Sequence, residues 1–279
     1  MNALQRSNKN FSRRVLYAVA LLASVALLGT NGFASGLARQ ESQPAQPAFT
    51  SALGAVESLF KAVQSGNEYS IAQILGSPTD ELSSDDEEQK GLDRELFVQK
   101  YQEMHRLSRE ADGSLTLYIG AENWPFPFPL VEKDGSWRFD ADKGRNEILF
   151  RRIGENELMA METCREFIAG EKQYRANPNV PDTEAPSLTS MVSKAVAGNG
   201  SGGSVSLHAY YFRILPGPKP RNGFVFIAYP AEYRSSGVMT FVVTKGGVIY
   251  EKDLGVNGVS IAGSMTTFHE DASWRIADE

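Results

Sequence analysis

Residues 124–139 read WPFPFPLVEKDGSWRF, and this stretch predicts how the first half of the chain folds. Asp134 and Gly135 are a strong signal for a tight hairpin, which returns the chain through residues 136–139. Proline has no backbone N–H to donate to a sheet. Residues 124–131 should therefore form an edge strand with its prolines facing outward, or an extended polyproline-like segment. In both cases the aromatic residues between the prolines point toward a core.

The same stretch supplies the candidate interaction surface. We expect Trp124, Pro125, Pro127 and Pro129 to form it, because an exposed tryptophan beside prolines could dock a peptide or a glycan. The alternative interpretation is that the aromatic residues of this stretch only pack beneath a helix.

Upstream of the hairpin, the sequence predicts three helices and a strand. Apolar residues recur every three or four positions in residues 53–63, 71–75 and 96–104, which is typical of one buried helix face. Residues 115–119 alternate apolar and polar side chains, as a half-buried strand does. The acidic run at residues 80–90 lacks the alternating acids and central glycine of a calcium loop, so a solvated loop is expected.

Downstream, one long helix is predicted over residues 146–174, with a bend at Gly154 and a new N-cap at Asn156. Cys164 falls in its apolar stripe with Leu158, Met161 and Ile168, and Phe167 flanks it, which favours a small core residue over a nucleophile. A loop rich in proline, glycine and serine follows at residues 177–206. Strands are then expected at residues 208–215, 223–229, 238–244 and 248–251, the last two forming a hairpin.

The N-terminus has the pattern of a secretory signal. Basic residues precede an uncharged apolar run at residues 15–28, and small residues follow it. The run is shorter than the ~20 residues of a membrane-spanning helix, so we expect contact with the membrane only through the signal segment and then cleavage, after Ala34 or Ala38. The pair Arg13 and Arg14 also fits the twin-arginine route, as an alternative to the general one. The predicted location is the periplasm or the extracellular space.

The composition is that of a globular protein with an acidic surface. The formal net charge is −6, and removing the four basic residues of the signal lowers it to −10. A negative protein repels phosphate backbones, so no nucleic-acid partner is expected. The single cysteine rules out an internal disulfide, so burial of side chains must stabilise the fold.

No pattern of catalytic or metal-binding residues emerges. The three histidines, His105, His208 and His269, lack the spacing of a zinc site, and no serine-hydrolase pentad occurs. We therefore predict no cofactor, no metal site and no catalytic residue. A glycosidase needs only two carboxylates held ~5–10 Å apart. The carboxylates to inspect for such a pair are Glu162, Glu166, Glu232 and Asp253.

Several strings resemble a bacterial family known only as domain of unknown function 2950. They include residues 124–127, 137–140, 147–154, 210–215 and 248–255. The resemblance covers nearly all of the chain after the signal and implies no activity. The loops at 177–207 and 216–223 are shorter than in typical members. The second half also resembles, more weakly, the head of pilin-like proteins, without their hydrophobic anchor helix.

Together these observations predict an α+β protein: N-terminal helices with a small antiparallel sheet, then a long helix packed on an antiparallel meander. The expected organisation is a signal peptide (1–34), a flexible linker (35–49), an N-terminal α+β domain (50–143) and a domain of long helix and sheet (144–279). We expect a non-catalytic structural or interaction module of the cell envelope, whose partner is an envelope protein or glycan. A small-ligand carrier and a hydrolase of an envelope polymer are the alternatives.

Overall fold

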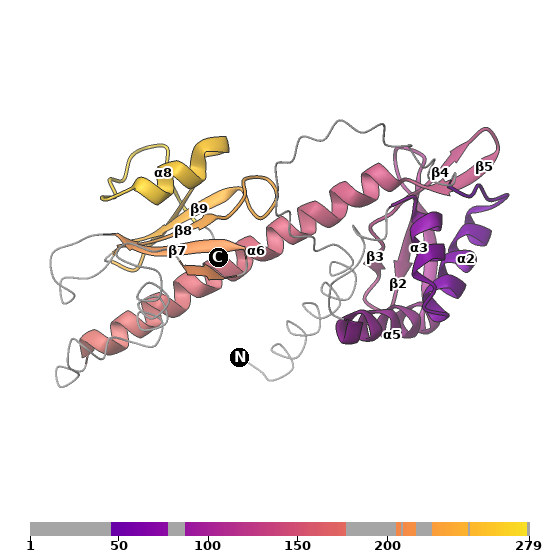
Figure 1. The fold of residues 1–279 in the computed structure, drawn as a ribbon, viewed down its shortest axis with the longest axis horizontal. Helices are drawn as coiled ribbons and strands as arrows, with labels where there is room; N and C mark the ends of the chain where they lie inside the picture. The colour runs from indigo at the N-terminus through magenta and orange to yellow at the C-terminus, as the bar shows by residue number, and fades with distance from the viewer. Residues whose placement is uncertain are drawn as a thin grey trace, which may run out of the picture. The chain divides into compact units, whose positions relative to one another are not determined.

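The computed structural model describes residues 46–77, 87–176, 205–207, 209–215, 225–244 and 246–277. The chain divides into two compact units, a first unit that ends at Arg151 and a second that begins at Arg152 (Figure 1). Within the described ranges, no helix combines the length and apolar character that a membrane span needs. The predicted signal peptide (1–34) lies outside those ranges.

Three helices of the first unit precede its sheet: α2 (Ala52–Gln64), α3 (Glu68–Leu75) and α5 (Glu87–Glu103). Ser51 caps α2 by accepting a hydrogen bond from the N–H of Gly54, and α3 ends at Gly76, whose φ of 69° suits glycine. The three helix predictions are confirmed. The predicted loop at 80–90 is wrong at its end, because α5 already begins at Glu87. Glutamate is a good helix former, which favours this earlier start.

The first sheet has the strand order β1-β2-β4-β5, and β3 also pairs with β2. The strands are β1 (His105–Arg109), β2 (Leu115–Ile119), β3 (Trp124–Pro125), β4 (Leu130–Lys133) and β5 (Ser136–Phe139). The predicted hairpin is confirmed: Asp134 and Gly135, both with positive φ, join β4 to β5.

Of the two alternatives predicted for residues 124–131, an edge strand or an extended polyproline-like segment, the edge strand is wrong. Prolines interrupt the ladder, so this stretch forms two short strands, β3 and β4, and β4 pairs with β2 on one side and β5 on the other. Nor do all three prolines face outward. Pro127 is buried, whereas Pro125 and Pro129 are half-buried.

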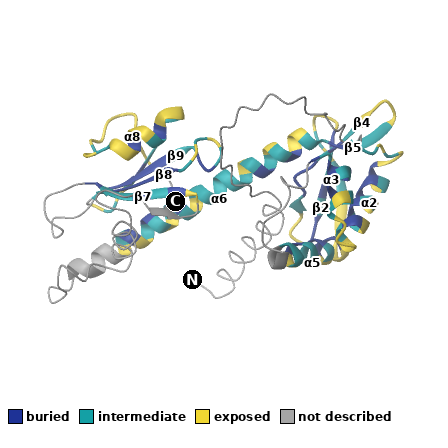
Figure 2. Ribbon diagram, viewed as in Figure 1, coloured by how far each residue is buried: buried dark blue, intermediate teal, exposed yellow. Residues whose placement is uncertain are grey.

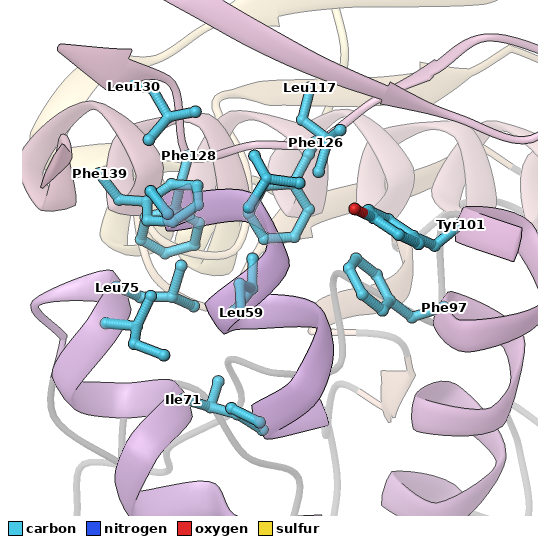
Figure 3. Packing of buried hydrophobic residues seen from close by; sticks show 14 of the residues in the cluster. Leu59, Ile71, Leu75, Phe97, Tyr101, Leu117, Phe126, Phe128, Leu130 and Phe139 are labelled. Atoms are coloured by element: carbon cyan, nitrogen blue, oxygen red, sulfur yellow. The ribbon is translucent and has the colours of Figure 1, made fainter. Parts of the chain in front are cut away.

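One face of this sheet packs on the helices and forms the core of the first unit. Because side chains alternate along a strand, Leu117 and Ile119 enter the core while Thr116 and Tyr118 face the other way. Figure 3 shows Leu59 and Leu75 of the helices among the rings of the sheet segment, which are Phe126, Phe128 and Phe139. Figure 2 shows the buried side of α2 turned toward this core.

The N-terminal end of the described chain is attached to the same core. The side-chain amide of Gln46 donates to the carbonyls of Ile74 and Phe139, each at 2.9 Å. Phe49 exchanges two backbone hydrogen bonds with Trp137, at 2.8 and 2.7 Å. These residues fall in the predicted flexible linker (35–49), yet here they pair with β5.

Helix α6 (Ala141–Ala176) begins in the first unit and continues into the second. It is continuous through Gly154 and Asn156, so the predicted new N-cap at Asn156 is wrong. The amide of Asn156 instead donates to the carbonyl of Ser236, at 2.8 Å. In the first turns of α6, Gly144 lies directly against the buried ring of Phe128: a Cβ at this position would lie 2.0 Å from a ring carbon.

The second unit is an antiparallel sheet of order β11-β10-β9-β8-β7-β6. Its strands are β6 (Val205–Leu207), β7 (Tyr210–Leu215), β8 (Val225–Pro230), β9 (Met239–Val243), β10 (Ile249–Asp253) and β11 (Arg275–Ile276). The predicted meander and α+β class are confirmed. The strand expected from residue 208 begins instead at Tyr210, because Ala209 has a φ of 60° and turns the chain from β6 into β7. His208 itself is outside the described residues.

Both faces of the second sheet are covered. Cys164 and Phe167 of α6 pack against Tyr210, Phe212 and Phe226 on one face. Leu158, predicted for the apolar stripe, is exposed instead. The opposite face is covered by helix α8 (Gly258–Ser264), which η2 (Gly255–Asn257) precedes, and by the C-terminal segment, from which Phe268 and Trp274 dock as expected. Helix α8 was not predicted.

Candidate interaction groove

An open groove of about 740 Å³ lies on the first unit, and all of its lining residues belong to that unit. One side is the β1–β2 connection with the outer face of β2, and the other is the first three turns of α6. The proline segment between β3 and β4 also lines it. The groove is therefore on the side of β2 opposite to the core.

Local periodicity places the lining side chains. Thr116 and Tyr118 alternate with the buried Leu117 along β2, so both reach the groove. On α6, Lys143, Glu147 and Phe150 are spaced four and three residues apart and share a helix face. Gly144 and Ile148 lie on the neighbouring face and contact the core.

The residues predicted as an interaction surface lie at this groove. Pro125, Pro127 and Pro129 all line it. Trp124 is half-buried against the core and has the guanidinium of Arg151, a lining residue, 4.8 Å from its ring centroid. Trp124 is therefore less exposed than expected and interacts with the groove through its cation–π partner.

Two ion pairs fix the polar walls. Lys143 Nζ lies 2.6 Å from a carboxylate oxygen of Asp112, and Ser114 donates to the other oxygen from both its hydroxyl and its backbone N–H. The hydrogen bond from Lys143, followed by those from Ser114, holds the pKa of Asp112 well below its usual range. Glu147 accepts from Arg151 Nε at 2.7 Å, within α6.

The groove also contains two buried polar atoms without a hydrogen-bond partner among the described residues. One is an acceptor, Oε1 of Glu110, and the other is a donor, Nη1 of Arg151. A buried group that makes no hydrogen bond costs about 1–3 kcal/mol, so a ligand that supplies both partners would be favoured. Phe150, by contrast, offers an apolar ring that is 67% exposed.

The sequence did not single out Glu110, Tyr118, Phe150 or Arg151. The available signal was the spacing of Ile148 and Phe150, two apolar residues in the first turns of α6. Residues two positions apart lie on nearly opposite sides of a helix, so only one of them can face the core; here Ile148 is buried and Phe150 is exposed.

The other residues considered from the sequence lie elsewhere. His105 stacks on Tyr101 with its Nδ1 2.9 Å from the Tyr101 carbonyl, and His269 is exposed. No cluster that could hold a metal ion occurs among the described residues. Cys164 is fully buried, and burial raises its thiol pKa to about 12, which confirms the core assignment.

The four carboxylates singled out for a glycosidase pair belong to the second unit and are all exposed. Glu162 lies 3.5 Å from Arg165 on the same helix. Asp253 accepts from the Tyr233 hydroxyl at 3.1 Å and from the N–H of Gly255 at 2.7 Å. None of these contacts joins two of the four carboxylates across a cleft.

Comparison with known proteins gives one match. The model of a family described as "Protein of unknown function (DUF2950)" matches residues 46–200 and 177–277. No curated protein and no solved structure matches the chain. The predicted likeness to pilin heads therefore has no support from these comparisons.

Proposed function

The chain belongs to the DUF2950 family, and from that premise we propose that it is a non-catalytic interaction module whose partner-binding site is the groove of the first unit. One observation carries the proposal. An open groove combines an exposed aromatic ring, Phe150, with an acceptor on Glu110 and a donor on Arg151 that have no hydrogen-bond partner in the described part of the chain. Exposed apolar surface beside unmet polar groups is typical of a binding surface.

Two features favour binding over catalysis. The hydrogen bond from Lys143 lowers the pKa of Asp112, so Asp112 is poorly suited to donate a proton to a substrate, and the carboxylate of Glu147 is already paired with Arg151. The groove is also open along its length, whereas a carrier of small ligands typically encloses most of its cargo.

We further propose that the module works outside the cytoplasm, on an envelope protein or glycan. The support is the basic and apolar pattern of residues 1–34 and the acidic charge of the rest of the chain. Export is tested by measuring the molecular mass of the chain in the envelope and cytosolic fractions, because cleavage of the signal shortens the exported chain. An unprocessed chain found only in the cytosol would contradict export.

A photocrosslinking side chain placed at position 150 tests the groove. Residue 158 is the matched control, because Leu158 is also an exposed apolar residue of α6 but does not line the groove. In intact envelopes we expect a distinct adduct from position 150 that is absent from position 158. Phe150→Ala should also reduce recovery of that partner by the purified chain, while Leu158→Ala should not. Identical adducts and identical recovery at the two positions would refute the groove as the site.

A further inference from the structure

The apolar part of the groove contains several aromatic and proline rings. Pro125 and Pro129 are half-buried, Tyr118 has the guanidinium of Arg106 4.3 Å from its ring centroid, and the ring of Phe150 is exposed. Grooves lined by aromatic and proline rings accept the pyrrolidine rings of a polyproline II segment, whose preformed shape reduces the entropy lost on binding.

The backbone of this wall disfavours the other common way to bind a peptide. Strand addition needs a row of free backbone N–H groups, and Pro125, Pro127 and Pro129 have none. β3 and β4 are in addition already paired with β2. A polyproline II ligand needs no ladder, and its carbonyl groups stay free to accept from a side chain such as Arg151.

The charges of the groove select what the ligand carries. Five charged residues line it, and four of them form the pairs Asp112–Lys143 and Glu147–Arg151. The fifth, Glu110, has a buried carboxylate oxygen with no hydrogen-bond partner in the described residues. A lysine or arginine side chain complements this carboxylate better than a sugar hydroxyl, because hydrogen bonds between opposite charges are roughly twice as strong as neutral ones.

We propose that the groove binds an extended, proline-containing peptide segment of a partner protein, with a lysine or arginine side chain directed to Glu110. This inference rests on the proposed function, since it names the ligand class of the same site. The peptide's rings would pack on Phe150 and the proline wall, and its backbone carbonyl would accept from Arg151.

Calorimetry with the purified full chain tests the proposal. The probes are three nine-residue peptides of repeated Pro-Pro-X, with X as Lys, Ser or Glu, and a tetramer of N-acetylglucosamine. We expect the Lys peptide to bind about tenfold more tightly than the Ser peptide, because it adds a charged hydrogen bond to Glu110, and the Glu peptide to bind most weakly. Glu110→Gln should remove the preference for Lys over Ser. Glu132→Gln, an exposed carboxylate of β4 outside the groove, should keep it.

Equal binding of the three peptides, or binding of the sugar tetramer alone, would overturn the peptide inference. So would the absence of all binding. The crosslinking experiment then separates the two proposals. If position 150 still captures an envelope partner that position 158 does not, the groove remains an interaction site with another ligand class. If the two positions behave alike, both proposals fail.

Discussion

Two glycines of the same helix should respond oppositely to alanine. Gly144 and Gly154 both lie in α6, where glycine costs about 1 kcal/mol relative to alanine. At Gly154 no atom lies within 4 Å of an added Cβ, so Gly154→Ala should raise the free energy of unfolding by about 0.5–1 kcal/mol. At Gly144 the added Cβ would lie 2.0–2.4 Å from three ring carbons of Phe128, which is 1% exposed and closely packed.

The ring of Phe128 cannot move without disturbing the core, because it packs near Phe126. Overpacking of this kind costs about 1–3 kcal/mol. After the gain in helix propensity of about 1 kcal/mol, Gly144→Ala should lower the free energy of unfolding by up to about 2 kcal/mol. Urea unfolding followed by tryptophan fluorescence measures the change, since Trp124 and Trp137 both report on the first unit. If Gly144→Ala stabilises the protein as much as Gly154→Ala does, the inferred close packing of α6 on Phe128 is refuted.

Three other predictions concern single contacts. Glu157 Oε1 accepts from the backbone N–H groups of Val238 and Met239, at 2.9 and 3.0 Å. In urea unfolding, Glu157→Ala should therefore destabilise the second unit by about 2–3 kcal/mol, and Glu157→Gln by less. A small and equal loss of stability in both variants would contradict this. Cys164 should not react with a thiol reagent at pH 8 until urea is added, because burial raises its pKa to about 12; rapid labelling of the folded chain would show that the thiol is accessible. Lys143→Met should raise the pKa of Asp112 toward that of a free carboxyl, as followed by NMR titration. Since the folded-state pKa is lowered, the stabilisation by this pair is present above the unfolded pKa of ~3.9 and is lost as the pH falls through the folded value.

The sequence predicted those helices and turns that depend on the pattern of a few neighbouring residues. The spacing of Leu59 with its neighbours gave α2, the pair Asp134 and Gly135 gave the hairpin, and the stripe around Cys164 gave the buried face of α6. These features depend on backbone geometry and amphipathicity, which a short window of sequence contains.

The features that the sequence did not reveal depend on distant contacts. Helix α8 is short and contains Gly258 and Gly263, so its own propensity is weak. Arg213 of β7 supports it from the sheet by donating to the carbonyls of Ala262 and Met265, both at 2.6 Å.

The sequence also did not predict the groove, apart from its prolines. Its walls come from three separate segments, and the contact between Asp112 and Lys143 joins two exposed side chains that are 31 residues apart. The error at residues 124–131 has a related cause. The missing N–H groups of the prolines indicate where the hydrogen-bonded ladder of the sheet is interrupted. They do not indicate whether the chain pairs again a few residues later, as it does at Leu130, which pairs with β2 on one side and β5 on the other.

The cover on the second face of the larger sheet has a consequence for synthesis. Ile227, Tyr229 and Val242 are shielded by α8 and by Phe268 and Trp274, which follow strands β7 to β10 in the chain. Since domains fold as the chain emerges, this apolar face stays exposed to the solvent until residues 258–274 have been synthesised. A nascent chain stalled near residue 255 would therefore expose apolar surface to chaperones, and a stop codon at that point would yield a product prone to aggregate.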